Sequence, residues 1–246
     1  MPMRLGASLA IGGYDKIPFQ PQSLGSALVA WWDPDYGITK NSVSNRVSAW
    51  QDRVTNTTLI QNTGARQPLW VADAVEMNSR PSLTYDVQPS FLFVNPSPAA
   101  LRVQQQENTY LAVVRGNKDI ISTGGLTAGN MLLMLFSSKV RAHVWFTSSL
   151  STQDGLTTVG VTTRALVGQM SDATKVYPIV NGTKDNTGVA IGTPTTPASV
   201  FSVGWRGSST SESYLGRIGD VLVFNRALTD AELSKIYLWA KERWAL

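Results

Sequence analysis

Acidic residues that lie close together are the first place to look for chemistry, because a glycoside hydrolase needs two carboxyl groups beside the scissile bond. The chain has five glutamates, namely Glu76, Glu107, Glu212, Glu232 and Glu242. The one close acidic pair, Asp230 and Glu232, lies where a helix is expected to begin, and helix capping explains it without catalysis. Carboxylates from separate strands could still meet, so a glycoside hydrolase stays open as a second alternative.

Nucleophilic, metal and nucleotide chemistry find few suitable residues in this chain. His143 is the only histidine, and there is no cysteine. A catalytic triad would have to use His143, but no Gly-x-Ser-x-Gly segment is present to place a serine nucleophile. A phosphate-binding glycine loop is also missing. We therefore predict that the protein is not an enzyme, with no catalytic residues, no zinc and no nucleotide.

Two aspartates in a tight loop, Asp33 and Asp35, are the candidate for a calcium site. They stand in Asp33-Pro-Asp35-Tyr-Gly37, which lacks the further ligands of an EF-hand loop. Aspartates that accept hydrogen bonds within a turn explain the pattern better. We expect no metal or other cofactor, and we keep calcium at Asp33 and Asp35 as the alternative.

Eight tryptophans are more than a chain of this size requires. Trp31 or Trp32, together with Trp50, are expected in the core, because large aromatic side chains contribute much of the buried area of a sandwich. Three other aromatic residues lie near predicted turns, where a ring could stack on a sugar or anchor a protein: Tyr36, Trp70 and Trp205. These three are the candidate ligand-binding residues, with packing as the competing interpretation.

The elements that would position these residues are mostly strands. Short apolar segments separated by turns begin at Leu28 and are typical of an all-β sandwich. Residues 221–224 form an apolar run that predicts a central strand covered on both faces. Residues 175–180, followed by Asn181-Gly182, predict a hairpin, since both turn residues tolerate a positive φ. Pro178 would place that strand at a sheet edge.

One helix is predicted, over about residues 230–244. Thr229 and Glu232 form a capping box at its start, and Leu228 and Leu233 can pack together across it. The helix carries an apolar stripe at three- and four-residue steps, made of Leu233, Ile236, Ala240 and Trp244. This stripe must pack on a sheet or on a partner. The sequence thus predicts two parts, an extended N-terminal arm or linker over residues 1–26 and one domain over residues 27–246.

Charge and hydropathy exclude several partners. The net charge is +4, but the lysines and arginines are scattered singly, so we expect no nucleic-acid binding. The longest apolar run, residues 131–136, has the length of a strand, and glycines dilute the apolar N-terminus. We therefore expect no membrane insertion and no signal peptide.

Several segments together resemble phage proteins of the laminin-G-like, concanavalin-like superfamily. They are Leu28-Val-Ala-Trp-Trp-Asp33 with Val47-Ser-Ala-Trp-Gln-Asp52 and Arg66-Gln-Pro68; Asn78-Ser-Arg-Pro-Ser-Leu-Thr-Tyr-Asp86; and the segment from Tyr214 through Asn225-Arg-Ala-Leu-Thr-Asp-Ala-Glu232. The resemblance covers roughly residues 28–246 and implies a two-sheet antiparallel jelly roll. Retaining glucanases of this superfamily carry a Glu-x-Asp-x-x-Glu strand, and this chain does not.

The resemblance implies a virion structural protein of a phage, in a tail, a fibre or the head surface, made in the host cytoplasm. Its N-terminal arm would bind other virion proteins, and a homo-oligomer is compatible with such a role. A carbohydrate-binding adhesion module that recognises host-surface glycans is the alternative. All of these functions use the same fold, so the fold alone does not separate them.

Overall fold

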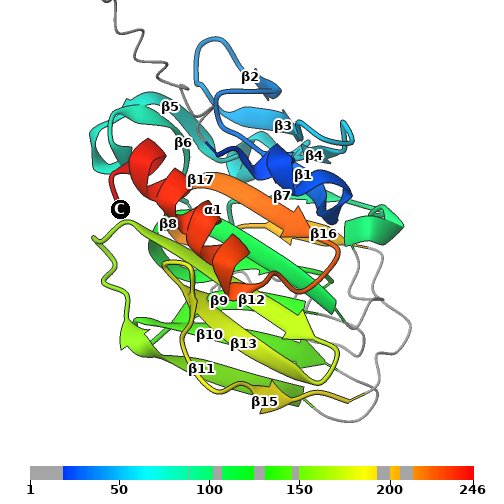
Figure 1. Ribbon diagram of the computed structural model, residues 1–246. Helices are drawn as coiled ribbons and strands as arrows, with labels where there is room; N and C mark the ends of the chain where they lie inside the picture. Colours follow the sequence, from blue (N-terminus) through cyan, green and yellow to red (C-terminus); the bar gives the residue numbers. More distant parts are fainter. Residues whose placement is uncertain are drawn as a thin grey trace, which may run out of the picture.

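The computed structural model describes residues 19–87, 89–101, 107–124, 131–145, 150–192, 200–205 and 213–246. Antiparallel strands dominate these residues, and α1 (Asp230–Trp244) follows the last strand (Figure 1). The described residues also contain four short 3-10 helices: η1 (Pro21–Ala27) precedes the first strand, and η2 (Gly64–Arg66), η3 (Val75–Met77) and η4 (Ala99–Leu101) lie between strands. Among the described residues, no helix is long and apolar enough to cross a membrane.

The first sheet is built around two long strands. Its order is β5 (Leu69–Ala74), β6 (Arg80–Tyr85), β17 (Leu215–Phe224), β8 (Glu107–Ser122), β12 (Ala165–Asp172) and β13 (Lys175–Val180). Beyond β6, the same edge of β17 pairs with β1 (Leu28–Trp32). The outer edge of β13 pairs with two two-residue strands, β14 (Thr183–Lys184) and β15 (Val189–Ala190).

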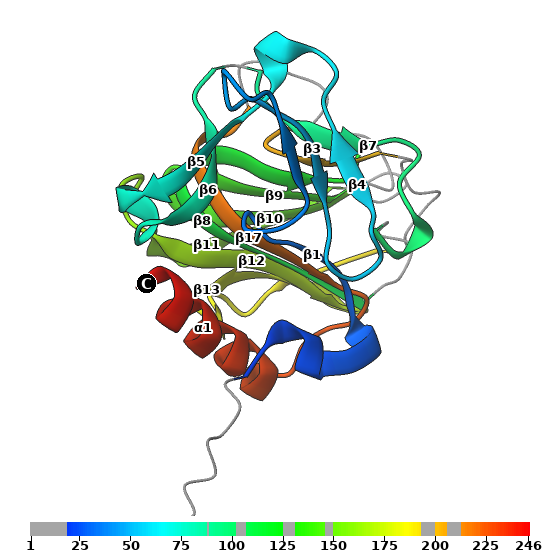
Figure 2. The same ribbon diagram turned by 90° about the horizontal axis from the view of Figure 1, so that it is seen from above.

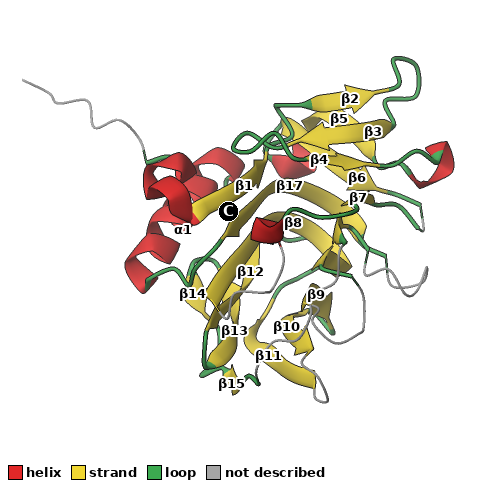
Figure 3. Cartoon of the chain, turned by 90° about the vertical axis from the view of Figure 1, so that its right-hand side faces the viewer, coloured by secondary structure: helices red, strands yellow, loops and turns green. Residues whose placement is uncertain are grey.

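The second sheet takes up the other end of β8 (Figure 3). Its order is β2 (Ile38–Lys40), β3 (Val47–Gln51), β4 (Thr58–Ile60), β7 (Leu92–Val94), β16 (Phe201–Val203), the end of β8, β9 (Met131–Phe136), β10 (Lys139–Trp145) and β11 (Leu150–Thr158). Every one of these pairs is antiparallel. The predicted all-β class, a two-sheet antiparallel sandwich with a C-terminal helix, is confirmed.

Strand β8 shows how the sequence divides its side chains between two hydrophobic cores. Tyr110, Ala112 and Val114 belong to the core between the sheets. Leu111 and Val113 belong to the core between the first sheet and α1. Since successive side chains of a strand point to opposite faces, a strand that is covered on both faces reads as a continuous apolar run.

Strand β17 follows the same rule and confirms the predicted central strand. Val221 and Val223 are fully buried in the core between the sheets. Leu222 and Phe224 face the core under α1 and are also buried. This part of β17 has β1 on one side and β8 on the other.

The predicted C-terminal helix is confirmed, with the predicted bounds. The Thr229 hydroxyl accepts the backbone N–H of Glu232, and the Glu232 carboxylate accepts the backbone N–H of Thr229. The apolar stripe is buried in the core that α1 shares with the first sheet, at Leu233, Ile236, Ala240 and Trp244. Figure 2 shows α1 on the outer face of this sheet, beside η1.

The predicted hairpin is also present. Asn181 and Gly182 have φ values of 47° and 79°, and they connect β13 to β14. A Cβ on Gly182 would lie 2.8 Å from the Leu233 carbonyl oxygen in α1. The hairpin therefore passes under the helix, where only glycine fits without strain.

Residues 1–18 of the predicted N-terminal arm lie outside the described residues. The remainder of that segment contacts the domain, because Phe19 and Leu24 pack against the core under α1. Pro21 opens η1 and is buried, as is Ala27 at its end. The division of the chain at residue 26 stays a prediction.

Candidate binding site

The sequence contains two Trp-x-Asp units, Trp31 to Asp33 and Trp50 to Asp52, which lie at the C-terminal ends of β1 and β3. Trp31 and Trp50 are buried, which confirms their predicted place in the core. The Asp52 carboxylate accepts backbone N–H groups of residues 54, 55 and 57. Trp50 Nε1 donates to the backbone carbonyl of Asp33 at 3.0 Å. This hydrogen bond connects the second Trp-x-Asp unit to the first.

The calcium candidates Asp33 and Asp35 are held by arginines. Arg243 Nη2 lies 2.7 Å from Asp33 Oδ1 and 2.8 Å from Asp35 Oδ2. Arg53 Nε lies 2.7 Å from the other oxygen of Asp33, and Asp33 Oδ1 also accepts the backbone N–H of Asp35. No cluster of three or more His, Cys, Asp or Glu side chains that could hold a metal occurs in the described part of the chain. Both carboxylates thus form ion pairs with arginines, and Asp33 also accepts a hydrogen bond within the turn.

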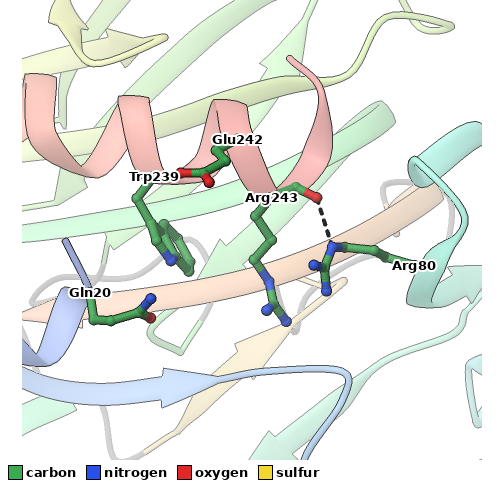
Figure 4. A pocket seen from close by; sticks show the side chains of 5 residues that line it. All are labelled: Gln20, Arg80, Trp239, Glu242 and Arg243. Atoms are coloured by element: carbon green, nitrogen blue, oxygen red, sulfur yellow. Dashed lines mark hydrogen bonds between the residues drawn. The ribbon is translucent and has the colours of Figure 1, made fainter. Parts of the chain in front are cut away.

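Arg243 lines a hollow at the C-terminal end of α1, drawn in Figure 4. This helix-end hollow measures about 310 Å³ and is lined by Gln20, Arg80, Trp239, Glu242 and Arg243. Arg80 Nε donates to the Arg243 carbonyl at 2.8 Å. Both guanidinium groups are thus committed to neighbouring groups of the chain. The side chains that line this hollow therefore help to attach the end of α1 to the rest of the domain.

The third partner of Arg243 is Asp220, which is fully buried in β17. Its carboxylate accepts Arg243 Nε at 3.0 Å. It also accepts the indole N–H groups of Trp31 at 2.8 Å and Trp244 at 2.6 Å. Burial raises the pKa of Asp220 to about 6, against the opposing charge of Arg243. This cluster connects α1, β1 and β17.

Two of the three candidate ligand-binding residues, Tyr36 and Trp70, line one hollow of about 290 Å³ together with Lys40. Lys40 Nζ lies 3.9 Å from the centre of the Trp70 ring, and Arg53 Cζ lies 4.5 Å from the centre of the Tyr36 ring. A cation over an aromatic face is a favourable contact in itself. One face of each ring is therefore already in contact with a cationic side chain of the protein.

The third candidate, Trp205, lines a larger pocket at the ends of β4, β7 and β16. This Trp205 pocket measures about 410 Å³. Its described lining consists of aromatic, amide, hydroxyl, aliphatic and guanidinium side chains: Gln61, Asn62, Thr63, Arg66, Phe91, Phe93, Asn95, Val200 and Trp205. The pairing of β7 with β4 and with β16 brings these three chain segments together.

An aromatic platform forms the apolar part of the pocket. The rings of Phe91 and Trp205 are stacked, with centroids 4.3 Å apart and planes 26° apart. Phe93 lies 5.8 Å from Phe91 in a tilted arrangement. Phe91 is buried, whereas Phe93 and Trp205 are half-buried. The buried ring therefore fixes the orientation of Trp205, which keeps part of its surface at the pocket.

Hydrogen bonds hold the polar loop of the pocket in place. Gln61 is buried, and its Oε1 accepts the backbone N–H of Thr63 at 3.0 Å. The Phe91 backbone N–H donates to the Arg66 carbonyl at 3.0 Å. These bonds fix the loop to the segment that carries the platform, so amide and guanidinium groups stand beside aromatic rings.

Sequence reasoning found one residue of this pocket and missed the others. Phe91 and Phe93 could have been noticed as alternating aromatics, which point to the same side of a strand. Arg66 belongs to the Arg66-Gln-Pro68 motif, but nothing in that motif predicts a place beside Trp205. The missing information is strand order, which local patterns do not contain.

A comparison with protein-family models finds no match, and neither does a comparison with curated protein sequences. Solved structures do match. Domain 4 of AbnA, a GH43 extracellular arabinanase from Geobacillus stearothermophilus, in complex with arabinotriose, has a TM-score of 0.58 and 15% identity, over 85% of this chain and 98% of that one. The Trypanosoma rangeli sialidase in complex with sialic acid has a TM-score of 0.58 and 14% identity, over 86% of this chain and 33% of that one.

A further match is the binding domain of botulinum neurotoxin serotype G, with a TM-score of 0.58 and 10% identity, over 77% of this chain and 48% of that one. At these identities the likeness shows the fold alone. The chain spans about a third of the sialidase chains that it matches.

The prediction that the protein is not an enzyme is corrected by these matches. The same fold occurs inside sialidase chains and as a domain of an arabinanase. A fold that is part of such enzymes gives no ground for excluding enzymes, because function depends on the site and on the rest of the chain. The lack of a recognised catalytic motif was therefore too little evidence for that prediction.

Proposed function

We propose that the protein binds carbohydrate in the Trp205 pocket. The observation that carries the proposal is the half-buried Trp205 ring stacked on Phe91, beside amide, hydroxyl and guanidinium side chains. Ligand sites typically combine apolar and aromatic walls with a few well-placed polar groups. A sugar ring offers both kinds of surface, since its C–H faces can lie on an aromatic ring while its hydroxyls bond to amides.

The volume of the pocket and the matched structures support this proposal. About 410 Å³ lies within the roughly 300–1,000 Å³ range of small-molecule sites. Two of the matched structures were solved with carbohydrates, sialic acid in one and arabinotriose in the other. In the hollow around Trp70, Lys40 lies over the Trp70 ring and Arg53 lies over the Tyr36 ring.

The test is a glycan array followed by calorimetry on the sugars that bind. We expect Trp205→Ala to weaken binding at least tenfold, which corresponds to about 1.4 kcal/mol, because it removes the half-buried ring that stacks on Phe91. Trp70→Ala is the matched control, since Trp70 is also half-buried but lines the other hollow. Thermal melts of both variants establish that they are folded. A blank array, or equal loss of binding in both variants, would contradict the proposal.

We also propose, from the sequence resemblance, that this carbohydrate-binding protein serves at a virion surface and attaches through its N-terminal segment. Residues 19–27 contact the domain, so the deletion that tests attachment removes residues 1–18 only. We expect the shortened protein to remain folded and to lose complexes with virion subunits, as measured by light scattering. Unchanged assembly would exclude attachment through this segment.

A further inference from the structure

Arg66 is the one charged side chain among the described residues that line the Trp205 pocket. Its side chain is exposed, and it forms no hydrogen bond or ion pair with any described residue. The other described lining residues are amides, a threonine, aromatics and a valine. This part of the wall therefore carries a single positive charge and no acidic group that would repel an anion.

Most of the described arginines of this protein are paired with an acidic side chain. Seven of the described arginines form ion pairs with aspartate or glutamate, namely Arg46, Arg53, Arg80, Arg141, Arg217, Arg226 and Arg243. Arg66 lies instead at the wall of a pocket without an acidic partner among the described residues. A guanidinium in such a place is available to a carboxylate from outside the protein.

The backbone at Arg66 is fixed relative to the aromatic platform. Arg66 ends η2, where its N–H donates to the Thr63 carbonyl at 2.8 Å. Its carbonyl accepts the N–H of Phe91 at 3.0 Å, and Phe91 supports Trp205. The base of the arginine side chain and the stacking ring therefore belong to one hydrogen-bonded unit. A ligand that lies on the ring is within the same pocket as the guanidinium.

We infer that the pocket selects an acidic sugar, whose carboxylate pairs with Arg66 while its ring lies at Trp205. This inference rests on the proposed carbohydrate binding and adds the class of sugar. Arginine binds a carboxylate through two parallel N–H donors, which gives strength and orientation together. The net charge of +4 favours the approach of an anionic glycan.

The experiment compares each acidic sugar with a counterpart in which the carboxylate charge is removed. Calorimetry measures the binding of trigalacturonate, its methyl ester and the neutral galactose trimer, and of sialyllactose and its methyl ester. In at least one of these series, we expect the acid to bind at least tenfold more tightly than its neutral counterpart, and this preference to weaken as salt is added. The methyl ester tests the charge at nearly constant shape, without any change to the protein.

Variants then assign the preference to Arg66. We expect Arg66→Gln to make the affinities for acid and neutral sugar equal within about twofold, and Arg66→Lys to retain part of the preference, since a lysine keeps the charge but loses the two-pronged geometry. Arg164→Gln, which removes the same charge outside the described pockets, should leave the preference unchanged.

The outcomes separate this inference from the proposed function. Equal affinity for acid and neutral sugars, with binding still lost in Trp205→Ala, overturns the acidic sugar and leaves carbohydrate binding in place. An acid preference that survives Arg66→Gln also overturns the role of Arg66. If none of these sugars binds and the glycan array is blank, both proposals fail together.

Discussion

At the scale of single residues, several buried carboxylates and seven of the described arginines are held by neighbouring groups, whereas the Arg66 side chain has no hydrogen-bond or ion-pair partner among the described residues. Asp33, Asp52 and Asp220 are buried carboxylates, and each accepts several hydrogen bonds within the chain. A buried charge must be paired in this way, because its desolvation is costly. This contrast is what makes Arg66 informative.

Glu232 offers a test of how much such pairing contributes. Arg226 donates two hydrogen bonds to its carboxylate, at 2.7 and 2.8 Å, and the Thr229 backbone N–H donates a third at 2.9 Å. The bonds from Arg226, followed by those from Thr229, lower the pKa of Glu232 from 4.5 to about 2. Its carboxylate is therefore stabilised in its ionised form by the folded state.

We predict that Glu232→Gln lowers the free energy of unfolding by about 1–2 kcal/mol at pH 7, because glutamine still accepts the Thr229 N–H but loses the charge that pairs with Arg226 and with the positive end of the helix dipole. Because the folded-state pKa is depressed, the contribution is complete above about pH 4.5 and is lost as the pH falls toward 2. Urea unfolding at pH 7 and pH 3 should show that the difference between wild type and variant is smaller at pH 3.

Glu242→Gln is the control for this measurement, since Glu242 lies on the same helix and is exposed. It should change the free energy of unfolding by less than about 0.5 kcal/mol. A difference between wild type and Glu232→Gln that is the same at both pH values would show that the charge of Glu232 plays no part.

At the scale of elements, local sequence patterns correctly predicted the helix, the central strand and the hairpin turn, because each of these depends on neighbouring residues. The capping box and apolar stripe defined α1, and the run from Val221 to Phe224 defined a central strand, because each pattern needs only the period of its own element. Asn181-Gly182 marked a turn for the same reason. These features were correct without any knowledge of the rest of the chain.

The Trp205 pocket could not be predicted in this way, because it depends on which strands pair. Gln61, Phe91 and Trp205 come from three separate parts of the sequence, and only the order β4, β7, β16 joins them. The same limit applies to Tyr36 and Trp70, since no local pattern showed that Arg53 and Lys40 would lie over their rings. The sequence showed that both residues are aromatic, but it could not show whether their ring faces are open to a ligand.

At the scale of the whole molecule, β8 is the strand that connects the two sheets. It pairs with strands of the first sheet along most of its length and with β9 and β16 of the second sheet at its end. Its side chains also alternate between the two hydrophobic cores. Loss of β8 would therefore disrupt both cores at once, and we expect the two layers to unfold together.

Two neighbouring valines in β8 test this expectation, because Val113 faces the core under α1 and Val114 faces the core between the sheets. Both are fully buried, so each change to alanine should lower the free energy of unfolding by about 2 kcal/mol. If the layers are coupled, Val113→Ala and Val114→Ala should each shift one single transition, with circular dichroism and tryptophan fluorescence superimposed. A second, earlier transition in Val113→Ala alone would mean that α1 and its core unfold separately from the core between the sheets.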